Sequence, residues 1–169
     1  MEMVQLWVNL PARHKMSPPK YQTLTHSSIP VVNVGDGGGT LRVVAGEYSG
    51  ARGPAQTFTP VNLWDLNLKK GTVFNLKVPG GATTALFILT GNVLLNGSQS
   101  ADDATLVRFD FVGDEISLKA EADTTLLVLN GVPIDEPVVG YGPFVMNTQQ
   151  EIRQAMEDYQ NGKFGVWNS

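Results

Sequence analysis

Two histidines decide whether imidazole chemistry is available to this chain. His14 lies in a proline-rich segment, and His26 lies just ahead of a predicted strand. A metal site needs several rigid ligands that are oriented by further hydrogen bonds. Ser27 and Ser28 follow His26 directly, but a nucleophile and its base must meet in space, which sequence neighbours seldom do. We therefore predict that neither histidine is a metal ligand or a catalytic base.

Three pairs of adjacent acidic residues are the other candidates for acid–base chemistry. They are Asp102-Asp103, Asp114-Glu115 and Asp135-Glu136. The first two pairs fall in predicted turns, where acidic side chains usually bond to nearby backbone or face solvent. The third pair is expected to tie its segment to backbone N–H groups or to an arginine, and the candidate arginines are Arg42, Arg52 and Arg108. The sequence therefore predicts no catalytic residue.

A glycine run, GDGGG at 35–39, invites comparison with a phosphate-binding loop. Such a loop needs the N–H groups of a helix start and, in its common form, a following Lys-Ser/Thr pair. Neither is present, because the next segment has the pattern of a strand. We interpret the run as the tip of a loop between strands.

Composition places the chain among globular proteins. It has 169 residues, of which 42% are hydrophobic and 17% charged, so it is long enough to bury a core as one domain. A formal net charge of -4 provides no basic surface for direct nucleic-acid binding. The sequence contains no cysteine, and no apolar run reaches transmembrane length. We expect a cytoplasmic protein that binds neither membrane nor nucleic acid.

The elements that must position these side chains are mostly strands. Strand-like segments lie at 29–34, 41–48, 61–68, 73–78, 84–89, 93–95, 105–111, 116–120 and 125–129. Most alternate apolar and polar residues, whereas 84–89 and 125–129 are almost continuously apolar, which predicts burial on both faces. Short strands separated by turns predict an all-β fold, an antiparallel β-sandwich or barrel.

The two ends of the chain have different patterns. Residues 4–10 read as a strand that ends at Pro11, followed by a proline-rich connector, so we assign 1–22 to a linker and 23–169 to the β domain. A short C-terminal α-helix is predicted at about 148–161. Thr148 and Glu151 fit a capping box, and Gly162 fits a C-terminal cap. The apolar stripe Ile152, Ala155, Met156 and Tyr159 predicts that this helix closes over the β core.

Three long segments resemble one protein family, the pirins. EPVVGYGPFVMNT (136–148), followed by EIRQAMEDYQNGKFG (151–165), is similar to the C-terminal signature of pirins. QLWVNLPARHKMSPPKYQ (5–22) resembles the segment that joins the two halves of a pirin, and RVVAGEYSGARGPAQTF (42–58) is also similar. The resemblance covers nearly the whole chain but only the later half of a pirin. It implies a cupin-like fold.

The resemblance also bears on cofactors. A typical pirin contains two cupin β-sandwiches, and its iron ligands, three histidines and a glutamate, lie in the first. The segment equivalent to a metal-binding strand here, VPGGATTALFILTG (78–91), has no His, Asp or Glu. Ligands would be sought at Ala82, Thr83, Thr84 and Ala85, and these residues bind iron poorly. We expect no cofactor in this chain, whereas full-length family members carry iron.

Two hypotheses of function follow. In the first, the chain is a pirin-like protein without the metal-binding half and acts as a non-catalytic cupin scaffold or interaction module. Its predicted interaction surface is Leu6, Trp7, Val8, Val138, Val139, Tyr141, Phe144, Val145 and Met146, covered by a second copy, by a complementary pirin N-terminal half or by refolded ends. In the second, it is part of an iron-dependent quercetin 2,3-dioxygenase, or of a redox-linked transcriptional co-regulator, whose metal site another chain supplies. A truncated remnant is a third possibility.

Overall fold

The structure, a computed structural model, describes residues 3–165 and divides into two compact units. The sandwich unit is Tyr21–Pro133, and the terminal unit combines Met1–Lys20 with Ile134–Ser169. The sequence suggested a division after residue 22, with the C-terminal helix in the β domain. In the structure that helix instead belongs with the N-terminal segment.

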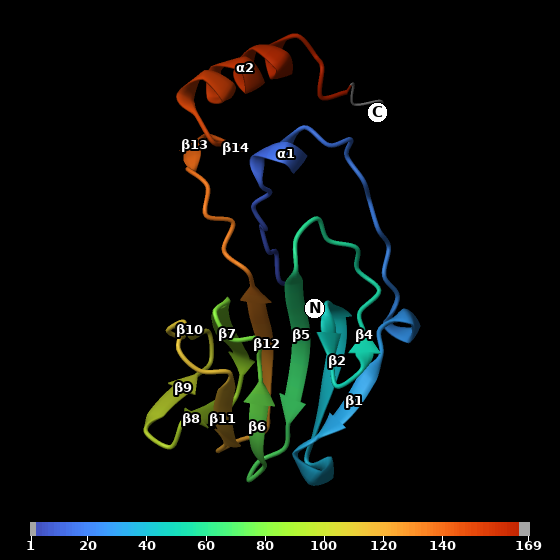
Figure 1. Cartoon of the computed structure of the whole chain (residues 1–169). Coiled ribbons are helices and arrows are strands. Elements are labelled where there is room, and N and C mark those ends of the chain that lie inside the picture. Colours follow the sequence, from blue (N-terminus) through green and yellow to red (C-terminus); the bar gives the residue numbers. More distant parts are fainter. Residues whose placement is uncertain (1–2, 166–169) are drawn as a thin grey trace. The chain divides into compact units, whose positions relative to one another are not determined.

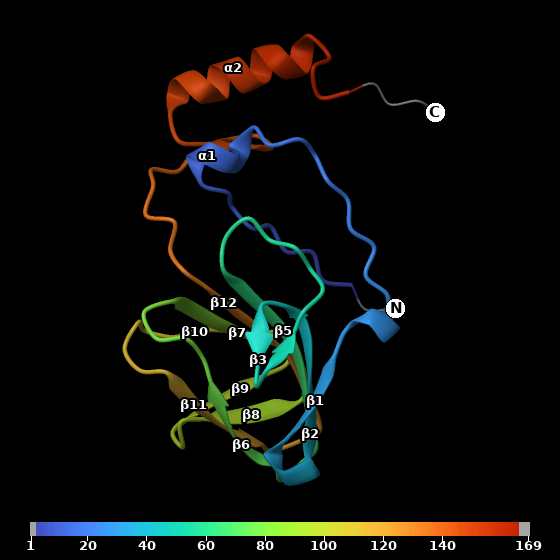
Figure 2. The ribbon, with the colours of Figure 1, turned by 45° about the vertical axis from the view of Figure 1, so that its right-hand side comes forward.

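Two antiparallel sheets stack face to face in the sandwich unit (Figures 1 and 2). The six-stranded sheet has the order β1 (Val31–Val34), β2 (Gly39–Ala45), β5 (Val61–Leu68), β12 (Thr124–Gly131), β7 (Thr83–Thr90) and β10 (Leu106–Arg108). The four-stranded sheet has the order β6 (Val73–Lys77), β11 (Glu115–Ala120), β8 (Asn92–Leu95) and β9 (Gln99–Asp102). A small hairpin, β3 (Glu47–Tyr48) and β4 (Ala51–Arg52), and two 3-10 turns, η1 (His26–Ser28) and η2 (Gly35–Gly37), complete the unit. The predicted all-β antiparallel sandwich is confirmed.

Alternation along each strand builds the core between the sheets. On β5, Trp64, Leu66 and Leu68 point inward and are buried. Among residues 3–165, Trp64 is the largest fully buried side chain, and the ring of Tyr48 packs edge-on against it at a centroid distance of 4.9 Å. Burial raises the pKa of the Tyr48 phenol above its ordinary value. The core is therefore a packed aromatic and aliphatic cluster.

The two continuous apolar strands are buried on one face only. On β7, Leu86 and Ile88 point inward and are fully buried, while Phe87 and Leu89 point outward and are partly exposed. Strand β12 shows the same alternation. The prediction of burial on both faces was wrong, because a sheet in a sandwich turns one face to its partner and leaves the other face less covered.

The glycine run forms the turn from β1 to β2, as predicted for a loop tip. Gly35 has a φ of +58°, a left-handed conformation that favours glycine, and a β-carbon there would collide with the Thr72 side chain. The turn leads directly into β2. The glycine run therefore forms the turn that reverses the chain direction between β1 and β2.

The terminal unit contains α1 (Ala12–Lys15), the hairpin β13 (Val139–Tyr141) with β14 (Phe144–Met146), and α2 (Gln149–Gln160). Residues 4–10, predicted as a strand, have no regular secondary structure. A strand requires a neighbouring strand for its backbone hydrogen bonds, and this segment pairs with none in the described part of the chain. The predicted strand is therefore absent.

Helix α2 begins and ends as the sequence indicates. Thr148 and Glu151 form a reciprocal capping box, and Gly162 follows the C-cap residue with a φ of +71°. Ile152 and Ala155 are buried on one face of the helix. This face packs against the β13–β14 hairpin of the same unit, in place of the expected contact with the β core.

Candidate interaction surface

A groove of about 350 Å³ lies in the terminal unit between the N-terminal segment and strand β14. Trp7 and Val8 line one side, and Val145 and Met146 line the other. Lys15 bridges the two segments, since its Nζ donates to Asn9 Oδ1 at 2.8 Å and to the Val145 carbonyl at 3.2 Å. Chain segments far apart in sequence thus form one apolar groove.

The nine residues predicted for an interaction surface all lie in the terminal unit. Six are exposed apolar or aromatic side chains: Leu6, Trp7, Val8, Val138, Tyr141 and Val145, with Trp7 at 71%. The other three, Val139, Phe144 and Met146, are partly buried. The groove brings together four of the nine, Trp7, Val8, Val145 and Met146.

Phe144 has a different environment from the groove residues. Its ring packs against those of Tyr159 and Phe164, at centroid distances of 6.2 and 6.1 Å. Tyr159 and Phe164 remain more than half exposed. Phe144 therefore belongs to an aromatic cluster at the end of α2, and its packing supports the hairpin from the helix side.

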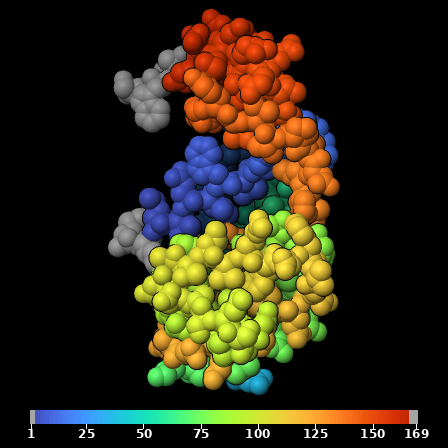
Figure 3. Space-filling view, turned by 90° about the vertical axis from the view of Figure 1, so that its left-hand side faces the viewer, coloured from blue at the N-terminus to red at the C-terminus, as the bar shows by residue number. Residues whose placement is uncertain are grey.

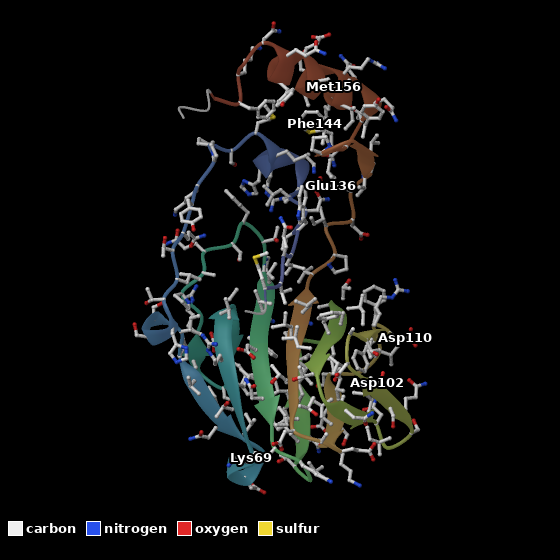
Figure 4. All side chains as sticks on the ribbon, turned by 180° about the vertical axis from the view of Figure 1, so that it is seen from behind. Lys69, Asp102, Asp110, Glu136, Phe144 and Met156 are labelled. Carbon is white, nitrogen blue, oxygen red and sulfur yellow. The ribbon has the colours of Figure 1, made fainter. Side chains whose placement is uncertain are left out.

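Glu136 ties the two ends of the terminal unit together. Its Oε2 accepts hydrogen bonds from the Ala12 backbone N–H at 2.7 Å and from Asn147 Nδ2 at 2.9 Å (Figure 4). The expected structural role of this acidic residue, bound to a backbone N–H group, is thus seen directly. Arg42, one candidate partner, pairs instead with Asp65 at 3.1 Å.

Replacing Glu136 with alanine should loosen the N-terminal segment. Two hydrogen bonds to one carboxylate are lost, and because Glu136 is only partly buried we expect a loss of only about 1 kcal/mol in stability. Amide hydrogen exchange at Ala12 should accelerate about tenfold. Glu157→Ala, at an exposed position of α2, is the control and should leave the exchange rate of Ala12 unchanged; equal acceleration in both variants would contradict the assignment.

The inner face of β7, where a cupin would place metal ligands, does not fit an iron site. Its inward residues are Ala82, just before the strand, and Thr84, Leu86 and Ile88, all buried. A non-haem iron site needs imidazole and carboxylate ligands that converge. No group of three or more His, Cys, Asp or Glu residues converges within residues 3–165. The side chains on this face therefore have neither the ligand types nor the geometry to hold iron.

The remaining candidates for chemistry have local roles. His14 Nε2 accepts from Arg13 Nε at 3.2 Å, and His26 is exposed in η1. Asp102 accepts from the Thr105 hydroxyl at 3.1 Å, and Asp103 accepts from the Gly91 N–H. Asp103 lies in the turn after β9, as predicted, whereas Asp102 is the last residue of that strand.

A row of neutral polar side chains crosses the inner face of the six-stranded sheet and was not predicted. Asn62, Asn130 and Thr84 are direct neighbours in register on β5, β12 and β7. Asn62 Nδ2 donates to Asn130 Oδ1 at 2.8 Å, and Asn130 Nδ2 donates to Thr84 Oγ1 at 2.9 Å. The one available signal was Asn130, a polar residue that ends an otherwise apolar strand.

No helix in the described part of the chain is long and apolar enough to cross a membrane.

Comparison with known proteins gives consistent results. Residues 63–165 match the family described as the Pirin C-terminal cupin domain. A Pseudomonas aeruginosa protein named "Putative quercetin 2,3-dioxygenase" is 47% identical over 164 residues, which is 97% of this chain and 57% of that protein. Pirin-1 of Arabidopsis thaliana is 39% identical over 96% of this chain and 58% of its own length.

A solved structure shows the same fold. The crystal structure of a quercetin 2,3-dioxygenase from Acinetobacter baumannii is 48% identical and superimposes with a TM-score of 0.91. The superposition covers 95% of this chain and 56% of that one. The chain thus spans little more than half the length of these relatives.

Proposed function

Because this chain belongs to the pirin family of cupin proteins, which includes relatives named as quercetin 2,3-dioxygenases, we propose that its residues form a non-catalytic scaffold and interaction module. The observation that carries this proposal is the inner face of β7. At the level where a cupin holds its metal, Ala82, Thr84 and Leu86 are buried, and the one polar side chain of the three, Thr84, is hydrogen-bonded to Asn130. On this proposal, any iron used with this module is bound by ligands outside residues 3–165.

The surface that performs this role is the nine-residue interaction surface of the terminal unit. Its exposed members are large and apolar, and the groove gives a partner side chain a place to insert. We propose that the partner is a metal-binding pirin half. The relatives support this choice, since about two-fifths of the Pseudomonas aeruginosa protein lies outside the segment matched by this chain. A second copy of the chain is the competing occupant.

Iron content tests the scaffold role. The purified chain is incubated with ferrous iron, desalted and subjected to elemental analysis. We expect almost no bound iron, since the interior provides no imidazole and carboxylate cluster in the described residues. About one iron per chain would overturn the proposal and would make His14 and His26 the first residues to replace.

A second candidate function is a shared dioxygenase, in which this module completes an iron-bearing half. The similarity to proteins named as quercetin 2,3-dioxygenases, at 47% and 48% identity, favours it. The test mixes the chain with the unmatched part of the Pseudomonas aeruginosa relative and measures quercetin oxygenation and iron content. Activity that requires both parts, with iron only on the added part, would support a shared enzyme. Activity of the added part alone would support a scaffold.

A further inference from the structure

A small cavity of about 210 Å³ opens at one end of the sandwich unit, separate from the interaction surface. Its apolar walls include Val78, Ala82, Phe109 and Ile116. They come from the ends of β6 and β7, from the loop after β10 and from β11. The cavity is smaller than the usual site for a drug-sized ligand, so it fits a single ring with a short substituent.

Thr84 is the buried polar residue of the cavity lining, which also includes the exposed Asn96. The residue lines the cavity and is 3% exposed. Thr84 Oγ1 accepts a hydrogen bond from Asn130 Nδ2, and Asn130 Oδ1 in turn accepts one from Asn62 Nδ2. A hydroxyl that accepts a hydrogen bond keeps its own proton for donation. A buried donor gains most from an acceptor that reaches it inside the cavity.

The outer edge of the cavity is acidic. Asp110 and Glu115 line it, and the segment 110–115 contains three acidic residues and no basic one. Lys77 stands opposite Glu115 in the sheet register and offsets one of these charges. Asp110, which is labelled in Figure 4, lies in the loop between β10 and β11. Strand β9, which precedes β10, is on the side of the sandwich unit that faces the viewer in Figure 3. The edge therefore favours a positively charged group over a negative one.

We propose that this cavity binds a small hydroxylated aryl-alkylamine. The ring packs between Phe109 and Ile116, the ring oxygen accepts a hydrogen bond from Thr84, and the ammonium group lies against Asp110 and Glu115. The three parts of this ligand correspond to the apolar wall, the buried hydroxyl and the acidic edge. This site is independent of the scaffold role proposed above.

Tyramine is the probe, titrated into the full chain by isothermal calorimetry. We expect saturable binding of one tyramine per chain. Phenethylamine, which lacks the ring oxygen, should bind about fivefold to tenfold more weakly, because one hydrogen bond contributes on the order of 1 kcal/mol. 4-Hydroxyphenylacetate, which carries the opposite charge, should not bind.

Variants assign the roles of the residues. Thr84→Val keeps the shape of the side chain and should reduce tyramine affinity to that of phenethylamine, while leaving phenethylamine affinity unchanged. Asp110→Asn should weaken both amines about fivefold. Asp102→Asn, on β9 and outside the cavity lining, is the matched control and should bind tyramine normally.

Two outcomes would overturn the proposal. One is the absence of saturable tyramine binding by the wild-type chain. The other is equal tyramine affinity in the wild type and in Asp110→Asn, an exposed position whose replacement does not disturb the core. The second measurement remains decisive if Thr84→Val fails to fold.

Discussion

Replacing Trp64 with alanine should lower the free energy of unfolding by about 3–5 kcal/mol, the largest loss expected for a single substitution in this chain. Trp64 is 1% exposed and lies at the centre of the packed core, with Tyr48 against its ring. Its removal loses the transfer free energy of the indole and leaves a cavity that rigid neighbouring strands fill only in part. Urea denaturation followed by far-ultraviolet circular dichroism measures the loss.

Trp7→Ala provides the matched control for this result. It removes the same side chain from a position that is 71% exposed, so the free energy of unfolding should change by less than about 0.5 kcal/mol. The chain has three tryptophans, of which Trp167 lies outside the described residues, and the Trp64 variant should lose the blue-shifted part of the emission because Trp64 is buried. Equal destabilisation by the two substitutions would show that the core has been misidentified.

Replacing Trp7 with serine should weaken binding to a metal-binding pirin half about thirtyfold, which corresponds to about 2 kcal/mol. Trp7 is the largest exposed side chain that lines the groove. Tryptophan residues of this kind supply much of the binding energy at protein interfaces. Surface plasmon resonance with the immobilised unmatched part of the Pseudomonas aeruginosa relative measures the affinity.

Val112→Ser is the control for Trp7→Ser. It shows whether the loss of any exposed apolar side chain weakens binding to the pirin half. Val112 is 93% exposed but belongs to the sandwich unit. Its replacement should leave affinity for the pirin half unchanged. The proposed surface would be rejected if Trp7→Ser bound as tightly as the wild type. If Trp7→Ser instead abolished self-association in sedimentation, a second copy would be the occupant of the groove.

Regular elements of this fold could be predicted where local pattern and local chemistry agree. Strand β5 spans the predicted residues 61–68, because its alternation corresponds to the two faces of a strand. The capping box of α2 was also predictable. The Thr148 side chain accepts from the Glu151 backbone N–H, and the Glu151 side chain accepts from the Thr148 backbone N–H, so no other part of the chain is needed. The alternation of β5 and the capping box of α2 each depend on residues only a few positions apart, so both can be recognised in the sequence.

Features that depend on distant partners could not be predicted. Residues 4–10 have an apolar pattern similar to a strand, but the sequence does not reveal whether another strand is available to pair with it. The β13–β14 hairpin is a local element and was also not predicted; Gly142 and Pro143 form its turn. The row of Asn62, Asn130 and Thr84 exists only through sheet register.

The bond between Glu136 and Ala12 has a consequence for folding during synthesis. The two residues are 124 positions apart, and the Lys15 contact with Val145 spans 130 positions. Residues 21–133 can therefore leave the ribosome and form their sheets while Ala12 still lacks its acceptor. Until residue 136 and the hairpin emerge, the N-terminal segment lacks the contacts with Glu136 and Val145 that hold it and is open to chaperones. Slow translation of codons after residue 133 would prolong that exposure.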